Sequence, residues 1–443
     1  MSDHRRVADG PRPARRQPAL LAALLLLVAA CGPSGPTPSP NPSPSSAGSS
    51  GSPATNACAP ASPAPSVDPS TVYQTIEDQV VAIRGLHPKT PVNPTILDEA
   101  GLKTYITDSF KKDNPPDVLA ANERILKAFG LLPADASLSD LYISLLSSQV
   151  AGLYSPDTKK LYVVSRSGAL GAIEKTTFAH EFTHALQDQN FDIGKLQLDE
   201  VGQGDRSLAR LSLVEGDAVL TQSTWQIQHL SQAELGELIA CAGGDDSLAV
   251  LMAMPPVLRE SLLFPYTLGL GFVQGLQSGG GYPAVNDAFG DPPASTEQIL
   301  HPDKYFAHEG PVAVTLPKDL AARLGSGWKV GLEDAFGEFQ MQVWLKQNTG
   351  VPAAIATDAA AGWGGDRVAV VDGPSGSWGV VLRTAWDTAK DAEEFESAAT
   401  PLVGKLADPA ALLPGAGDKE RWVVIGSDAA VLQRLETVLG LAG

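Results

Sequence analysis

The feature that most constrains this chain is the stretch Thr176–Asp192, which reads TTFAHEFTHALQDQNFD. It carries His180, Glu181 and His184 in the order H-E-x-x-H. In a helix the two histidines lie one turn apart on one face, where neutral imidazoles can take adjacent corners of a tetrahedral Zn²⁺ site. The glutamate beside the first histidine is close enough to reach a water bound to such an ion. The alternative is a core helix whose histidines only make hydrogen bonds.

The residues around the motif predict that this helix is buried. Phe178, Ala179, Phe182, Ala185 and Leu186 are uncharged and apolar, as a helix behind a metal site requires. With this motif the chain resembles the zincin metallopeptidases. The resemblance implies a zinc-dependent peptidase with one Zn²⁺ per chain, in which the two histidines bind the metal and the glutamate acts as the general base.

A third metal ligand is predicted on a second helix. Asp205–Leu230 has apolar residues on nearly every side, which predicts a largely buried helix, and Glu215 lies inside it. An ionised carboxylate in that place is costly unless it is paired or bound to a metal. Gly216 lets another helix approach closely, and we expect that helix to be the one with the histidines. We therefore expect Glu215 to complete the site.

The third ligand distinguishes subclasses of the zincin family. A metzincin would continue with Gly and His where this chain has Gln187 and Asn190. The segment from about 150 to 230 instead resembles the gluzincins, in which a glutamate on a later helix completes H-E-x-x-H. The chain departs from many thermolysin-like enzymes at Val219, where they have an aspartate that orients a histidine. Asp217 or another acid would have to take that role.

Three other acids are alternative third ligands. Asp199 and Glu200 lie in a polar loop between the two predicted helices, and Asp217 follows Glu215 closely. The carboxylate oxygens of all three suit Zn²⁺ chemically. The choice depends on which carboxylate reaches the two imidazoles.

Peptide hydrolysis needs a base and a donor that stabilises the oxyanion. Glu181 would be the base. His301 is our candidate for the oxyanion donor, and Tyr266, Tyr282 and Tyr305 are alternatives. The structural explanation for His301 is a cap at a helix C-terminus, and for each tyrosine a residue at the edge of the core.

The N-terminal residues read as an export signal. Arginines within the first 16 residues precede the apolar run Ala19–Ala30, which is too short to span a bilayer. The run ends in Val28-Ala29-Ala30-Cys31, which resembles a bacterial lipobox. The resemblance implies a signal peptide of residues 1–30 and a lipid on Cys31 that anchors the protein to the cell envelope, outside the cytoplasmic membrane. A plain secretory signal is the alternative.

Composition divides the rest of the chain. Residues 31–70 are rich in Pro, Ser and Gly and predict a disordered tether. Residues 71–350 are expected to form the zincin-like domain, beginning with a helical lead-in at 71–149. Residues 351–443 predict a small C-terminal α+β module that packs on the catalytic body or binds a partner. The fold class is therefore expected to be α+β, mainly helical in the catalytic domain.

A β-hairpin is predicted just before the histidine helix. Val150–Tyr154 and Lys160–Arg166 are rich in strand-forming residues and flank the turn sequence at 155–158. In the zincin fold an edge strand beside the helix takes the substrate backbone as an added strand, so the resemblance implies this task for the hairpin. The alternative is an ordinary structural hairpin.

Charge and cysteines limit the expected partners. A net charge of −18 repels phosphate backbones, so nucleic acid is not an expected partner. Outside the cytosol Cys58 and Cys241 can form a disulfide. We expect a peptide or protein substrate, and membrane contact through the lipid on Cys31. The alternative function is a non-catalytic lipoprotein that binds envelope components, with a structural zinc or none.

Overall fold

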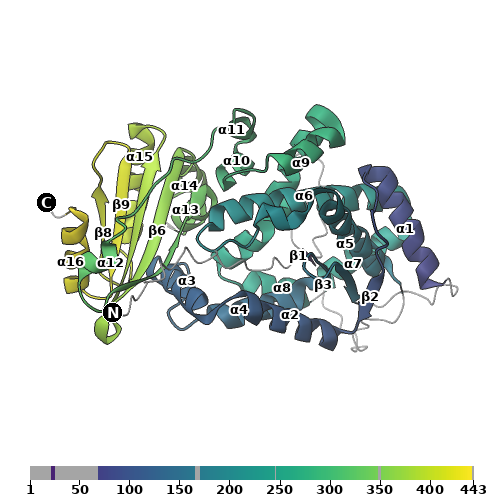
Figure 1. Ribbon diagram of the computed structural model, residues 1–443, viewed down its shortest axis with the longest axis horizontal. Coiled ribbons are helices and arrows are strands. Elements are labelled where there is room, and N and C mark those ends of the chain that lie inside the picture. The colour runs from purple at the N-terminus through teal and green to yellow at the C-terminus, as the bar shows by residue number, and fades with distance from the viewer. Residues whose placement is uncertain (1–20, 25–67, 165–169, 245, 348–350, 442–443) are drawn as a thin grey trace, which may run out of the picture.

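The computed structural model describes residues 21–24, 68–164, 170–244, 246–347 and 351–441. Figure 1 shows a mainly helical part at one end of the molecule and a five-stranded sheet at the other. The predicted α+β fold class is confirmed. Cys31, Cys58 and the predicted tether up to residue 67 lie outside the described residues.

The predicted helical lead-in is present. The side chains of Asp68, Asp98 and Ser137 each accept a hydrogen bond from a first-turn backbone amide and so begin three of its helices. Between the first two helices, Pro94–Leu97 forms a short strand, β2. The helices are α1 (Pro69–Arg84), α2 (Glu99–Asp113), α3 (Pro116–Ala128) and α4 (Leu138–Gln149).

A four-stranded sheet has the order β1-β3-β4-β2. β3 (Val150–Ser155) and β4 (Lys160–Val164) form the predicted hairpin. Its two faces pack in separate cores: Leu153 lies with the apolar residues of α2, and Tyr154 with those of the histidine helix. β2 pairs with β4 in parallel. β1 (Leu21–Leu24), from the predicted signal peptide, pairs antiparallel with β3, so this edge of the hairpin accepts an extended segment.

Three helices form the centre of the molecule: α5 (Ala172–Phe191), α6 (Gly204–His229) and α9 (Pro256–Gly290). Gly216 on α6 and Gly269 on α9 bring these two helices together, because a Cβ on either would collide with the backbone of the other helix. The expectation that Gly216 admits the histidine helix is therefore wrong; the close neighbour at Gly216 is α9. α9 bends at Gly280 and Gly281, where the backbone leaves helical geometry.

Short elements complete the helical part. After α5 comes a 3₁₀ turn, η1 (Ile193–Leu196), and after α6 come α7 and α8, which continue towards α9. Cys241 is buried on α7, and its predicted pairing with Cys58 stays a prediction. The remaining helices here are α7 (Gln232–Gly244), α8 (Asp246–Ala253), α10 (Thr296–Leu300) and α11 (Pro302–Phe306). The next helix in the chain, α12 (Leu320–Leu324), packs with the five-stranded sheet instead (Figure 1).

The C-terminal unit is an antiparallel sheet in the order β5-β6-β7-β9-β8. It begins with β5 (Lys329–Asp334), so the predicted boundary at 351 is wrong: a long connection separates β5 from its partner β6, and no local pattern marks that pairing. The other elements are β6 (Trp363–Asp372), β7 (Trp378–Trp386), β8 (Ala410–Pro414), β9 (Glu420–Gly426), α13 (Gly337–Lys346), α14 (Ala353–Asp358), η2 (Pro374–Gly376), α15 (Ala389–Val403) and α16 (Ala429–Leu439).

Both faces of this sheet are covered. Along β6, Val368 and Val370 point into the core with α13 and α15, while Ala369 and Val371 point to α12 and α16. This alternation follows from the two-residue period of a strand. Each face therefore buries its own apolar residues.

The C-terminal unit packs directly on the helical part, as predicted. The Trp344 indole nitrogen donates a hydrogen bond to the carbonyl of Phe129 at 3.1 Å. The Phe129 ring also contacts Trp344 and Phe336, with centroid distances of 5.0 and 4.9 Å. The two parts thus share one apolar core across α3 and α13.

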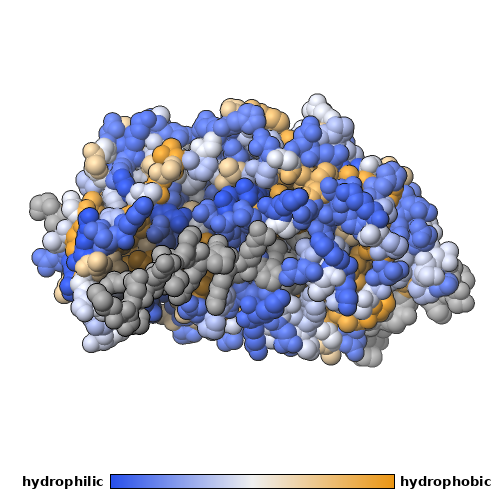
Figure 2. Space-filling model, in the orientation of Figure 1, coloured by the Kyte–Doolittle hydropathy of each residue, from blue (hydrophilic) through white to orange (hydrophobic). Residues whose placement is uncertain are grey.

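The surface in Figure 2 is mostly hydrophilic, with scattered apolar patches. Among the residues that the structure describes, no helix has the length and apolar character needed to cross a membrane.

Candidate metal centre

The middle of α5 is enclosed on all sides. Every residue from Thr176 to Asp188 is buried, and His180, Glu181 and His184 are each 0% exposed. β3 covers one side: Gly152 lies so close to α5 that a Cβ there would touch Thr177 and come within 3.5 Å of Glu181 Cγ. The strand that pairs with β1 therefore lies directly against the glutamate of the motif.

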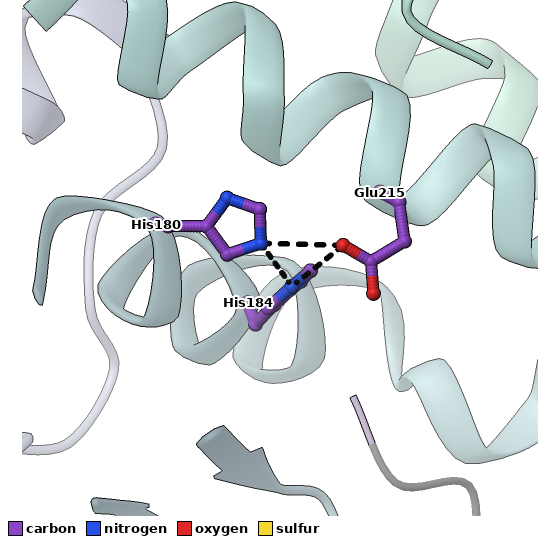
Figure 3. A group of neighbouring side chains, drawn as sticks. All are labelled: His180, His184 and Glu215. Carbon is purple, nitrogen blue, oxygen red and sulfur yellow. Dashed lines mark hydrogen bonds and ion pairs between the residues drawn. The ribbon is translucent and has the colours of Figure 1, made fainter. Parts of the chain in front are cut away.

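Three side chains from two helices converge on one point. His180 Nε2 lies 3.2 Å from Glu215 Oε2, His184 Nε2 lies 3.4 Å from the same oxygen, and the two Nε2 atoms are 3.1 Å apart. Figure 3 shows both imidazoles on α5 pointing at the carboxylate, which comes from α6. No other acid is needed to complete the triangle.

The size of this triangle fits a zinc ion. A tetrahedral ion with bonds of about 2.0–2.1 Å holds its ligand atoms roughly 3.3 Å apart, and the three measured separations lie between 3.1 and 3.4 Å. Of the described residues, these three form one of two groups of acids, histidines or cysteines with ligand atoms close enough to share an ion. Two imidazoles and a carboxylate are also a ligand set that zinc prefers.

Two glutamines orient the imidazoles. The Nδ1 atoms of His180 and His184 lie 2.9 Å from Gln222 Oε1 and Gln187 Oε1, respectively. An amide oxygen accepts a hydrogen bond, so each Nδ1 carries the proton and each Nε2 presents its lone pair. When both histidines are neutral, the two Nε2 lone pairs and the Glu215 oxygen face one another in a buried space, an arrangement that a cation, either a proton on His184 or a metal ion, stabilises.

The orientation of Gln187 is itself fixed by a chain of contacts. Its Nε2 donates to the carbonyl of Val214 at 2.9 Å and to Asp217 Oδ2 at 2.8 Å. Asp217 forms an ion pair with Arg84 at the end of α1, with 2.7 Å between Oδ1 and Nε and both side chains fully buried. The guanidinium also lies over the ring of Tyr282, 4.6 Å from its centroid. Asp217 thus acts on His184 through Gln187 rather than directly.

Sequence reasoning missed Gln187, Gln222 and Arg84. Gln187 had a signal: it stands three residues after His184, within one turn of the same helix face. Gln222 and Arg84 have no such signal in the sequence, because their relation to α5 depends on how α6 and α1 pack.

The buried charges at the centre are compatible with a cation. Asp217 is paired with Arg84. Glu181 and Glu215 are buried carboxylates beside the two histidines, and buried carboxylates of this kind are stabilised by a positive charge. A metal ion between the imidazoles and Glu215 would be one source of that charge.

The pKa values show how strongly the ligands interact. Burial alone would raise the pKa of Glu215, but His184 and His180 outweigh it and lower the pKa to about 2. Burial lowers the pKa of His184, but Glu215 and Glu181 outweigh it and raise the pKa to about 9. Burial lowers the pKa of His180. A proton on His184 is what a metal ion would displace.

The alternative third ligands have other partners. Glu200, in the segment before α6, pairs with Arg206 in the first turn of α6. Asp217 pairs with Arg84, and Asp199 lines a separate cavity. Glu215 is the acid whose oxygen meets both imidazoles.

Of the four candidate oxyanion donors, Tyr266 lies beside the centre. Its ring stacks on His180, with 6.4 Å between centroids. His301 lies between α10 and α11, and its Nε2 is 3.0 Å from Glu338 Oε1, a contact that raises its pKa. These contacts lend no support to the oxyanion role predicted for His301. Tyr282 packs on Arg84, and the Tyr305 hydroxyl donates to a backbone carbonyl.

The second group of acids close enough to share an ion is Glu297, Glu309 and Asp387. The ammonium of Lys304 already lies among them, at 2.6 Å from Glu297 and Asp387 and 3.0 Å from Glu309. This cluster is therefore an ion-pair network that ties α10 and α11 to the C-terminal unit.

A family model matches the C-terminal unit. It is described as a domain of unknown function, DUF8575, and it covers residues 328–439. These limits coincide with the start of β5 and the end of α16, which supports the revised boundary. His180, His184 and Glu215 lie outside the matched residues. Comparison with curated proteins and comparison with solved structures give no match.

Proposed function

We propose that this chain is a zinc-dependent peptidase, exported and anchored to the cell envelope by a lipid on Cys31. The observation that carries the proposal is the convergence of His180, His184 and Glu215 at the spacing of a tetrahedral ion. The accompanying glutamate, Glu181, is the residue that distinguishes a hydrolytic site from a purely structural one.

A bound zinc ion would supply the Lewis acid that lowers the pKa of a water and polarises the scissile carbonyl. Glu181 would take the proton from the attacking water and pass it to the leaving amine. Its charge already acts on His184, and its side chain lies against Gly152 of β3. Gln187 and Gln222 would hold both imidazoles with Nε2 towards the ion.

The edge of β3 is where the substrate backbone would bind. Leu21–Leu24 pairs with this edge, antiparallel, from Tyr154 to Val150, so the edge can pair with an extended segment and would pair with a substrate peptide in protein that lacks the leader. Gly152 lies within this register and faces Glu181 on α5. A peptide on the same edge would therefore run past the general base.

One observation favours the alternative of a structural ion in a binding lipoprotein: the ligands are buried, with His180 and His184 fully enclosed.

The deciding experiment is hydrolysis of a mixed peptide library by protein from which the leader has been removed. The peptidase proposal expects cleavage that a chelator abolishes and added zinc restores. Full zinc content without cleavage of any peptide would favour the structural alternative.

A further inference from the structure

The hairpin of β3 and β4 is tied to α5 by hydrogen bonds and an ion pair at Asp188. Asp188 Oδ2 accepts one hydrogen bond from the Tyr154 hydroxyl on β3 and one from the Lys159 ammonium in the turn, each at 2.7 Å. The Asp188 side chain is 1% exposed, whereas that of Lys159 is 58% exposed. One buried carboxylate therefore joins both β3 and the turn that follows it to the helix that carries the two histidines.

Asp188 lies on the same face of α5 as the proposed general base. Glu181, His184 and Asp188 follow one another at intervals of about one helical turn. Gly152 of β3 packs against Glu181, and Tyr154, two residues further along the strand, bonds to Asp188. β3 is thus held against this face at two points, by close packing at Gly152 and by polar contacts at Tyr154.

The carboxylate of Asp188 depends on a cation from outside its own helix. A negative charge in the last turn of a helix is unfavourable beside the helix dipole, and α5 has no basic residue in its last turn. Lys159 supplies the positive charge. Burial raises the pKa of Tyr154, and Asp188 adds to the rise, so the phenol keeps its proton and acts as the donor.

The backbone at Lys159 is one that glycine adopts more readily. Its φ is 55°, in the left-handed region, and its amide donates to the Ser155 carbonyl at 2.8 Å to close the turn. Residues other than glycine are uncommon in this conformation. The backbone therefore gives no reason for a lysine at this position, whereas the contact of its ammonium with Asp188 does.

The polar contacts hold the part of the β3 edge that lies towards the turn. Leu21–Leu24 pairs with β3 from Tyr154 to Val150, so an extended segment on this edge passes both Gly152 and Tyr154. The stretch at Gly152 has its own close packing on α5. A peptide long enough to pair as far as Tyr154 would also use the stretch that Asp188 and Lys159 hold.

We propose that Lys159 and Asp188 are positioning residues, which hold the β3 edge at Tyr154 so that the enzyme favours extended peptide segments over dipeptides. The inference rests on the proposed peptidase function and names its substrate class. Neither residue would touch the reacting atoms, so both would act through the position of the strand.

The test uses zinc-loaded protein without the leader, and peptides that share one scissile pair of residues. A blocked dipeptide is compared with peptides extended on either side of that pair. In the wild type, kcat/KM should be higher for one of the extended peptides by roughly tenfold or more, because binding of remote residues favours the reaction. Lys159→Met should lower kcat/KM for this extended peptide roughly tenfold more than for the dipeptide, with zinc content unchanged.

Three further variants separate positioning from stability. Lys160→Met removes the same charge from the adjacent exposed residue and should keep the wild-type preference. Lys159→Arg keeps a cation and should restore most of the preference. Lys159→Met added to Asp188→Asn should cause little further loss, because both changes remove one ion pair. A general loss of stability would lower the cleavage of short and extended peptides alike.

Two results would overturn the proposal. One is a wild type that cleaves the dipeptide as well as every extended peptide. The other is Lys159→Met with the preference intact, or with a loss that Lys160→Met shares. Lys159 is largely exposed, so its replacement tests the proposal even if Asp188→Asn folds poorly.

Failure of the peptidase function gives a different result. If no peptide is cleaved, the labelled extended peptide is titrated onto the same proteins, and amide hydrogen exchange in β3 is followed by mass spectrometry. Weaker binding and faster exchange in Lys159→Met than in the wild type and Lys160→Met would support the positioning role. Equal binding and exchange in all three proteins would refute it.

Discussion

Gln187 fixes the ring of His184 through a contact of 2.9 Å between its Oε1 and the histidine Nδ1. The amide cannot turn around without losing its two acceptors on α6, the Val214 carbonyl and Asp217. The second histidine is therefore held in the tautomer that presents Nε2 to Glu215. A neutral amide does here what a carboxylate does in many metal sites.

Gln187→Ala should weaken zinc binding by roughly 10–100-fold, the usual effect of removing a group that orients a metal ligand. The affinity is measured by competition with a chromophoric chelator. Gln189→Ala is the matched control, because Gln189 lies on the same helix and contacts only the backbone of the lead-in among its described partners. Equal affinity in the wild type and Gln187→Ala would show that Gln187 has no orienting role.

Glu181→Gln should retain zinc and reduce kcat by roughly 10²–10⁴-fold, because the amide cannot accept the proton of the attacking water. Zinc content and peptide hydrolysis are measured on the same preparation. Glu393→Gln, on the exposed face of α15, should leave both unchanged. Wild-type hydrolysis by Glu181→Gln would remove this residue from the mechanism.

Tyr266→Phe should keep the ring that stacks on His180 but lose the hydroxyl, and kcat should fall by roughly 10–100-fold if that hydroxyl supports the oxyanion. His301→Ala should change kcat by less than about twofold, because the His301 ring is paired with Glu338. Steady-state kinetics on one peptide compares the two variants. A larger loss of kcat in His301→Ala than in Tyr266→Phe would instead support His301 as the oxyanion donor.

We expect Asp205, which lies away from the proposed metal centre, to make the stability of the fold depend on pH. It is buried at the start of α6, where its carboxylate accepts hydrogen bonds from the backbone amide and hydroxyl of Thr296. Burial raises its pKa from 3.8 to about 8, although Thr296 lowers it; Asp366 and Glu297 add to the rise. The folded protein thus keeps a proton that the unfolded chain loses, so stability falls as pH rises from about 4 to about 8.

Asp205→Asn removes this titration. The free energy of unfolding should therefore fall less between pH 5 and pH 8 in the variant than in the wild type, by on the order of a few kcal/mol. Urea unfolding of wild type and variant at pH 5 and pH 8 measures the difference in slope. Asp303→Asn, at an exposed position on α11, should follow the wild type. An unchanged slope in Asp205→Asn would show that Asp205 titrates normally.

The convergence of the three candidate ligands could be predicted because it depends on local chemistry. The spacing of His180 and His184 fixes both on one helix face, and Glu215 stood out as an acid inside an apolar helix. The hairpin of β3 and β4 likewise carries its own turn signal. Each of these features is encoded within a few neighbouring residues.

The features that were missed depend on packing between distant segments. Gly216 predicted a close helix contact, but not that α9 rather than α5 would make it. β5 pairs with β6 across a long connection, so composition placed the boundary of the C-terminal unit too late. The Arg84–Asp217 pair joins α1 to α6, and no sequence pattern links those positions.

The most direct test of the central claim is the zinc content of purified protein by elemental analysis, for the wild type, Glu215→Ala and Glu200→Ala. Glu200 is a suitable control because it lies in the same region and pairs with Arg206. We predict about one zinc per chain in the wild type and in Glu200→Ala, and almost none in Glu215→Ala. Absence of zinc from the wild type after loading, or full zinc content in Glu215→Ala, would contradict the proposed centre.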